Sequence, residues 1–238
     1  MASQSLTQSQ KAIASMDRGE QERIVNDTVK FLLVLDQKKM PIKKADINKH
    51  VLKEHSKAFP VIIAEAAKRL SKVFGIEVKE LEEKQKGSYI LLNKLEISSD
   101  DNHLIWGEED DSKRGLLMVV LSLIFMSGNV ITDNQLWSGL KKFGIEPDVP
   151  HEVFNDVKKL IMQEWVRQCY LEITRMPNTD PPLSEIKWGQ RAQQEITKRN
   201  VLSFVSKIYN IEELSQWTSQ WQDVLSSEGQ DENQPANS

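Results

Sequence analysis

Residues that could carry catalysis or bind a metal ion are few in this 238-residue sequence. Its four histidines are His50, His55, His103 and His151. The sequence contains neither the H-E-x-x-H nor the C-x-x-C spacing that is typical of zinc sites. The single cysteine, Cys169, has no histidine near it in sequence, and a lone cysteine is usually buried and inert. We therefore expect no metal site, no internal disulfide and a reducing compartment.

Clustered carboxylates occur in an acidic stretch between residues 96 and 111, which contains seven acidic residues and no lysine or arginine. The clusters are Asp100-Asp101 and Glu108 to Asp111. Such a stretch predicts a solvated linker, where no burial adjusts a carboxyl group for acid–base catalysis. The sequence also has no glycine-rich phosphate loop. It therefore predicts a protein that is not an enzyme and has neither a cofactor nor a small-molecule substrate.

Composition and hydropathy exclude three further classes of protein. Thirty-one basic and 35 acidic residues give a net charge of −4, so the chain as a whole is not a polycation. The longest apolar run, Gly115 to Met126, is far shorter than the roughly 20 residues that cross a bilayer. The first 19 residues lack the apolar core of a signal peptide. We expect neither secretion nor insertion into a membrane.

Hydrophobic periodicity predicts three helices and a hairpin in the first half of the chain. The helices cover Arg23 to Leu35, Lys43 to Leu52 and Pro60 to Phe74, and Gly75 is the expected stop of the third. The spacing of apolar residues then changes to every second residue at 76–78, which predicts a first strand. Tyr89 to Leu92 forms the second strand after a turn. This part of the chain is therefore expected to run helix, helix, helix, hairpin.

The same order returns after the acidic stretch. Helices are predicted over Leu116 to Met126, from Thr132 to Phe143 behind a capping box, and over Val153 to Met162. Strands are predicted over Trp165 to Ile173 and Ile186 to Trp188. Two more helices, at 191–209 and 211–225, close the chain. Ile42 is followed five residues later by Ile47, and Ile131 is followed five residues later by Leu136. This similarity between the two halves favours two copies of one unit.

Three helices followed by a hairpin are typical of a winged helix. The predicted fold class is therefore mainly α with short β-hairpin wings, arranged as a tandem winged-helix protein. The predicted parts are a disordered tail (1–19), winged-helix unit A (20–95), an acidic linker (96–112), winged-helix unit B (113–210), a C-terminal helix (211–225) and a second disordered tail (226–238).

Positive charge gathers in the first unit. Residues 37–79 contain eleven lysines and arginines and four acidic residues, a local charge of +7. Cations within reach of phosphates give affinity for nucleic acid without reading its sequence, so we expect non-specific contact with duplex DNA. The alternative is an ordinary solvated face. The predicted DNA-binding residues are Lys38, Lys39, Lys43, Lys44, Lys49, Lys53, Lys68, Arg69 and Lys72.

Several segments resemble the MAGE (melanoma antigen) homology domain, a tandem winged-helix module. They lie in the same order along residues 21–210 of this chain. They are Phe31-Leu32-Leu33, Pro41 to Asp46, Gly115 to Leu121, Gly128-Asn129, Lys158 to Leu160, Tyr170 to Glu172, Pro177 to Asp180, and Trp188-Gly189 with Arg191-Ala192. One departure is Gln190, where the family usually has proline. Residues Asp36 to Ile42 look most like the branch of the family found in the SMC five-six complex.

That resemblance implies a nuclear, chromosome-associated subunit with several partners. It would bind a RING-type ubiquitin ligase subunit and a kleisin subunit, contact SMC proteins indirectly, and act in DNA repair by homologous recombination. The family's leucine pair for the RING partner corresponds to Leu32 and Leu33, although both leucines could instead belong to the core. The kleisin groove is expected in the second unit. Its predicted lining is Leu121, Phe125, Leu160 and Met162, for each of which core packing is the alternative.

Two other functions fit the same pattern. A different MAGE-type ligase adaptor would bind no DNA. A winged-helix transcription regulator would need side chains that read bases on the third helix, and Ala64, Ala67 and Lys68 are not of that kind.

Overall fold

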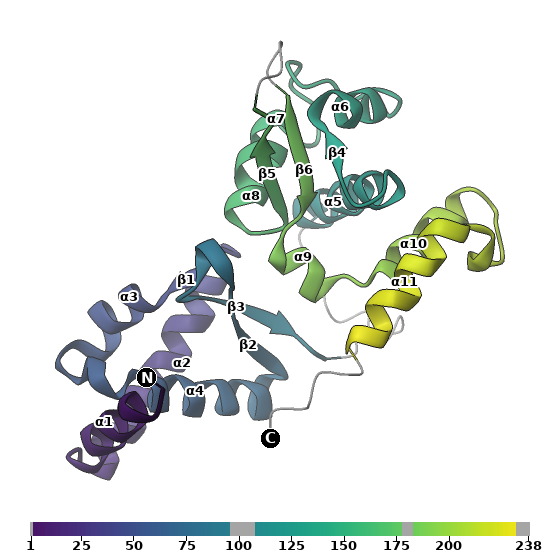
Figure 1. Cartoon of the computed structure of the whole chain (residues 1–238). Helices are drawn as coiled ribbons and strands as arrows, with labels where there is room; N and C mark the ends of the chain where they lie inside the picture. The colour runs from purple at the N-terminus through teal and green to yellow at the C-terminus, as the bar shows by residue number, and fades with distance from the viewer. Residues whose placement is uncertain (1, 96–107, 178–182, 232–238) are drawn as a thin grey trace. The chain divides into compact units, whose positions relative to one another are not determined.

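The computed structural model describes residues 2–95, 108–177 and 183–231 of the chain (Figure 1). The chain divides into two compact units, Met1–Asp101 and Asn102–Ser238. No helix in the described ranges is long and apolar enough to cross a membrane. Each unit is a small helical body with a three-stranded antiparallel sheet, which confirms the predicted tandem winged-helix fold.

In unit 1, two long helices and a hairpin follow the predicted order. Helix α2 (Arg18–Asp36) begins behind Asp17, whose side chain accepts a hydrogen bond from the Gly19 amide at 3.0 Å. Helix α4 (Phe59–Phe74) ends at Gly75, which has a left-handed φ of 64°. Strands β2 (Ile76–Glu80) and β3 (Ser88–Asn93) then form the wing.

The segment between α2 and α4 is more broken than predicted. We expected one helix over 43–52, but the chain forms strand β1 (Ile42–Lys43), helix α3 (Lys44–Ile47), a π-helical turn (Asn48–Leu52) and a 3-10 turn (Lys53–Ala58). Strand β1 pairs with β3, which gives the sheet order β1-β3-β2. A two-residue strand is too short to show any alternation in sequence, so the pattern could not reveal it.

The N-terminal region departs from the predicted disordered tail. Residues Ala2–Ala14 form helix α1, and Ala12, Ile13 and Met16 pack against the core of unit 1. The Ser/Gln-rich composition of the first ten residues hid this short apolar face.

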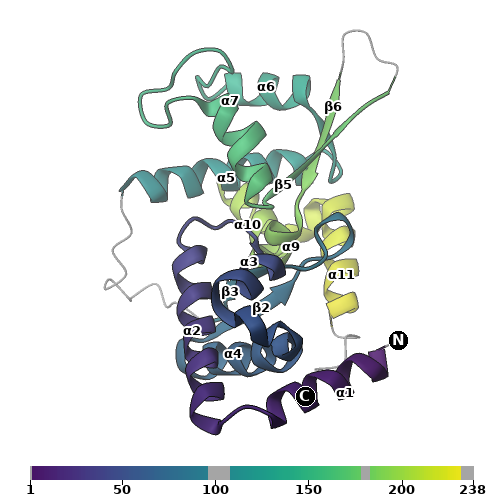
Figure 2. The same ribbon diagram turned by 90° about the vertical axis from the view of Figure 1, so that its left-hand side faces the viewer.

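Unit 2 repeats the arrangement with the sheet order β4-β6-β5 (Figure 1), and Figure 2 shows strands β5 and β6 of this sheet side by side. Its first helix is α5 (Glu108–Met126), followed by β4 (Ile131–Thr132) and α6 (Asp133–Lys141). The predicted capping box is present, because Gln135 donates its amide to Thr132 Oγ1 at 3.3 Å and accepts from the Thr132 amide at 3.0 Å. Strands β5 (Leu171–Arg175) and β6 (Ser184–Trp188) form the wing.

Two boundaries in unit 2 were predicted wrongly. The third helical segment begins after Asp156, which caps the Lys159 amide at 2.8 Å, and not at Val153. It consists of α7 (Val157–Lys159), a π-helical turn (Leu160–Glu164) and α8 (Trp165–Arg167). The three residues of α8 were therefore misread as strand. In the predicted linker, residues 96–107 lie outside the described ranges, and the backbone of Glu108 to Asp111 belongs to α5.

The C-terminal helices also differ from their predicted bounds. One helix was expected over 191–209, but extended backbone at Ile196 separates α9 (Gln190–Glu195) from α10 (Lys198–Ile208), which Thr197 caps. Helix α11 (Thr218–Asp231) begins later than residue 211 and continues past residue 225 into the predicted tail.

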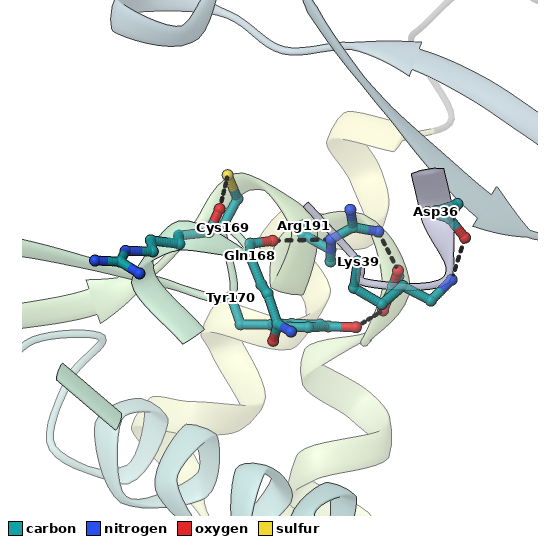
Figure 3. A network of polar contacts seen from close by, with 8 residues as sticks. Asp36, Lys39, Gln168, Cys169, Tyr170 and Arg191 are labelled. Atoms are coloured by element: carbon teal, nitrogen blue, oxygen red, sulfur yellow. Dashed lines mark hydrogen bonds and ion pairs between the residues drawn. The ribbon is translucent and has the colours of Figure 1, made fainter. Parts of the chain in front are cut away.

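Arg191 of helix α9 is buried against the base of the second wing (Figure 3). Arg191 is fully buried, and its Nε donates to the Gln168 carbonyl at 2.9 Å while Nη1 lies 3.1 Å from Glu195 Oε1. Tyr170 donates its hydroxyl to the same carboxylate at 2.7 Å. These bonds satisfy a charge that would otherwise be costly to bury.

Gly189 is required at this joint because a Cβ there would lie 2.3 Å from the Cys169 carbonyl oxygen. We predict that Gly189→Ala lowers the free energy of unfolding by about 1–3 kcal/mol, the usual cost of overpacking. Gly115→Ala is the matched control, since its Cβ at an exposed position of α5 meets nothing within 4 Å, and it should raise stability by about 0.5–1 kcal/mol. Urea denaturation measures both, and equal stabilities for the two variants would contradict the assignment.

Candidate interaction surfaces

The leucine pair on α2 has two different environments. Leu32 is 0% exposed and belongs to the core of unit 1, so the interpretation of this residue as a surface contact is wrong for the folded unit. Leu33 is only partly buried, and the next residue, Val34, is 60% exposed. The apolar arc of α2 is therefore wider than its core needs, as expected, but the surplus begins at Leu33.

A shallow hollow of about 450 Å³ lies between α2 and the turns at residues 50–55. Phe31 and Val34 line it from α2, and Val51 lines it from the opposite side. The His50 ring stacks on Phe31 with 6.0 Å between ring centroids. Sequence reasoning missed the wall formed by His50 and Val51, because their segment was expected to be one regular helix.

The predicted DNA-binding residues are not all available to a ligand. Lys39 forms an ion pair with Asp36 at the end of α2. Arg69 donates to Asn26 and lies 3.9 Å from Glu22, so it joins α4 to α2. Both side chains are half-buried. Seven of the nine predicted residues are exposed, namely Lys38, Lys43, Lys44, Lys49, Lys53, Lys68 and Lys72.

Six of these seven lysines fall into two groups on the local structure. Lys43, Lys44, Lys49 and Lys53 follow one another along β1, α3 and the turn after it. Lys68 and Lys72 lie one turn apart on the exposed face of α4. The Lys44 ammonium also lies 4.7 Å from the centre of the Phe59 ring, which holds this side chain near the start of α4.

In unit 2, the residues predicted to line a kleisin groove lie mostly in the core. Leu121, Phe125 and Leu160 are no more than 5% exposed. The Trp188 indole donates to the Leu121 carbonyl at 3.0 Å, and its ring lies 6.2 Å from Phe125. The alternative of core packing therefore holds for these three residues. Met162 alone of the four is half-buried at the edge of the core.

Unit 2 instead exposes apolar side chains outside the predicted groove lining, including Val153, which was expected to be buried at the start of the third helix. Phe143, Val149 and Val153 are 61%, 56% and 46% exposed along the connection from α6 to α7. Ile208 and Tyr209 are 59% and 66% exposed at the end of α10. Sequence periodicity could not identify them, because both groups lie at or beyond helix ends, where the 3.6-residue period stops.

Burial and neighbouring polar groups determine the environments of Tyr89, Tyr170 and Cys169. Burial, with a smaller contribution from Glu80, raises the pKa of Tyr89 to about 12. Burial also raises the pKa of Tyr170, and Glu195 adds to the effect. Cys169 is buried, and its Sγ lies 3.8 Å from the Arg167 carbonyl oxygen. Within the described ranges, no three His, Cys, Asp or Glu residues are grouped as metal ligands would be. Asp100-Asp101 lies outside the described residues.

Comparison with known proteins identifies the family. The model of the MAGE homology domain matches residues 28–199 of the chain. The chain belongs to the MAGE homology domain family. The match begins within α2 and ends within α10, so it spans both winged-helix units of this MAGE protein and leaves α1 and α11 outside.

Similar proteins narrow the position of this MAGE chain. It is 42% identical over 221 residues to the "Non-structural maintenance of chromosomes element 3 homolog" of Homo sapiens, covering 93% of this chain and 72% of that protein. The mouse (Mus musculus) protein of the same name is 44% identical over 204 residues, with 86% and 72% covered. "Melanoma-associated antigen D2" of Homo sapiens is 42% identical over 200 residues, with 84% and 32% covered.

A solved structure, the "Nse1-Nse3-Nse4 complex", contains a chain with the same fold. The TM-score is 0.83 and the sequence identity 43%. The alignment covers 88% of this chain and 100% of the solved one. The resemblance to the branch of the SMC five-six complex is thereby confirmed.

Proposed function

We propose that this MAGE protein is a non-catalytic subunit of the SMC five-six complex that joins a RING-type ubiquitin ligase subunit to a kleisin subunit and contacts DNA. The observation that carries the proposal is the 43% identity to a chain of the "Nse1-Nse3-Nse4 complex", which is matched over its full length. The two "element 3 homolog" relatives, at 42% and 44% identity, support the same position. The subunit would work in the nucleus, in DNA repair by homologous recombination and chromosome maintenance.

The RING partner is assigned to the exposed side of α2. Leu33 and Val34 present apolar surface there, and the hollow beside Phe31 and Val51 can receive a side chain of the partner. Leu32 has an indirect role, because its burial fixes the rotation of α2 and thus the direction in which Val34 points. Stimulation of the ligase would come from positioning the RING subunit, and not from chemistry on this chain.

The kleisin partner is assigned to unit 2. Of the four residues predicted for this role, Met162 is the one at the edge of the core, and the exposed Phe143 and Val153 add apolar surface. Exposed apolar side chains of this size usually mark contact with a partner.

Duplex DNA is assigned to the exposed lysines of unit 1. A surface of lysines suits phosphate contact and not base reading, and the one arginine predicted for this role, Arg69, is held by Asn26 and Glu22. This argues against a transcription regulator. The second candidate is a MAGE-type ligase adaptor without DNA binding, which the 42% identity to "Melanoma-associated antigen D2" favours.

Partner capture tests the assignment of α2. We predict that Val34→Asp weakens binding of the purified full chain to the RING subunit of the complex at least about tenfold, as loss of a buried interface contact does, with an unchanged melting temperature. Leu32→Ala should instead lower the free energy of unfolding by about 2–5 kcal/mol. Val73→Asp is the matched control, since Val73 is 63% exposed on α4. Equal binding by Val34→Asp and wild type, or an equal loss with Val73→Asp, would contradict the assignment.

Charge reversal tests the DNA contact. We predict that Lys43→Glu, Lys44→Glu and Lys49→Glu together abolish a gel shift with duplex DNA at low salt, and that wild-type binding falls steeply as salt rises. Reversal of Lys141, Lys142 and Lys158 in unit 2 removes the same charge and should leave the shift in place. Binding that survives the first triple change, or that is equally lost with the second, would favour the adaptor without DNA contact.

A further inference from the structure

A pair of Ser-Gln dipeptides lies next to the C-terminal helix. Ser215-Gln216 and Ser219-Gln220 are four residues apart in the segment LSQWTSQW. The sequence has three more Ser/Thr-Gln pairs, all within the first ten residues. Of those, Ser9 is 2% exposed, whereas Ser215 and Ser219 are both exposed. The pair at 215 and 219 is therefore accessible to an enzyme that modifies serine.

The first of these serines lies on an exposed connection between two helices. Helix α10 ends at Ile208 and α11 begins at Thr218, and the connection between them includes one short 3-10 turn, Leu214–Gln216. Kinases bind their substrates as extended segments, and the exposed connection that holds Ser215 can be accommodated in that form. Ser219 becomes extended when the first turn of α11 frays, as helix ends do. The connection is held at its end by Trp217, whose Nε1 donates to Ser206 Oγ at 2.9 Å.

The second serine lies in the first turn of α11. The Trp221 amide donates to the Trp217 carbonyl at 2.7 Å, so the helical ladder begins there and Ser219 is near the positive end of the helix. A phosphate at such a position is stabilised by the free amides and by the helix dipole. Phosphorylation of Ser219 should therefore favour the helical state of α11.

Helix α11 closes one side of unit 2, along α10 (Figure 1). Val224 is fully buried, and Trp217 and Trp221 pack against the core. Polar contacts add to this attachment. Asp223 accepts from Lys198 at 2.6 Å and from Asn129 at 2.7 Å, and Glu228 accepts two hydrogen bonds from Arg199 at 2.6 and 2.7 Å. Gln220 also donates to the Met126 carbonyl at 3.3 Å. A helix with so few buried residues is sensitive to a change at its first turn.

We propose that Ser215 and Ser219 are phosphorylation sites for a serine kinase that selects glutamine directly after the acceptor, and that phosphate on Ser219 tightens the attachment of α11. In the reaction, serine Oγ attacks the γ-phosphorus of MgATP, and the bond from that phosphorus to the β-phosphate oxygen breaks to leave ADP. The hydroxyl proton passes to the catalytic aspartate of the kinase. The product is a phosphate monoester with a charge of about −2. This inference goes beyond the proposed function and does not depend on it.

Labelling of the full chain tests the site. The chain is incubated with labelled ATP and a purified glutamine-directed serine kinase whose activity is checked on a Ser-Gln peptide, and the modified residues are mapped by mass spectrometry. We expect phosphate on Ser215 and Ser219 and none on Thr218, which is exposed but is followed by serine. The double change Gln216→Asn and Gln220→Asn keeps both serines and should lose most of the label. No label at either serine, or full label in the Asn variant, would overturn the proposal.

Thermal unfolding tests the effect on α11. A Ser215→Ala chain phosphorylated on Ser219 alone should melt about 1–4 °C above the same chain without phosphate, the range that one favourable charge at a helix start produces. The unphosphorylated Ser215→Ala chain should melt with the wild type, because the Ser215 side chain is exposed. An unchanged or lowered melting temperature after phosphorylation would overturn the stabilising role.

Discussion

The pairing of a two-residue strand with the wing is the interaction on which each unit depends. Ile42 pairs with Tyr89 in unit 1, and Ile131 pairs with Ile186 in unit 2. Both isoleucines are almost fully buried, and the residues five positions later, Ile47 and Leu136, are 0% exposed. The short strand therefore attaches the second helical segment to the sheet, and the core side chains pack between that segment and the sheet. Lys43 and Lys44 lie in or directly after the strand of unit 1, and Thr132 of the capping box lies in the strand of unit 2.

The cores use most of the large apolar side chains, which limits the surfaces left for partners. In a domain of about 100 residues, nearly every large side chain on the inner faces is needed for stability. Leu32, Leu121 and Phe125 are examples, because each is at most 1% exposed. The residues free to contact partners lie beside them, as Val34 does, or at helix ends, as Phe143 does. One fold thus leaves residues that the core does not require available for the contacts proposed above.

Sequence patterns predicted the fold better than the candidate sites. Periodicity and caps predicted α4 with its stop at Gly75, the capping box at Thr132, and the repeat visible in Ile42 and Ile131. They could not distinguish Leu32 from Leu33 as core and surface, since neighbouring residues on a wide apolar arc have the same hydropathy and only tertiary packing separates them. Likewise, no charge count could show that Arg69 is held by Asn26 and Glu22. The π-helical turns and the break at Ile196 also lack a local signal.

The proposed membership of a chromosome-maintenance complex, in which this MAGE protein would join the RING and kleisin subunits, determines how all of these surfaces are interpreted. Affinity purification of the tagged full chain from cells, followed by mass spectrometry, tests that membership most directly. We predict that SMC proteins, a kleisin and a RING-type ligase subunit are recovered together in comparable amounts. Recovery of a RING ligase without SMC or kleisin subunits would contradict this membership and would place the chain among MAGE adaptors of another kind.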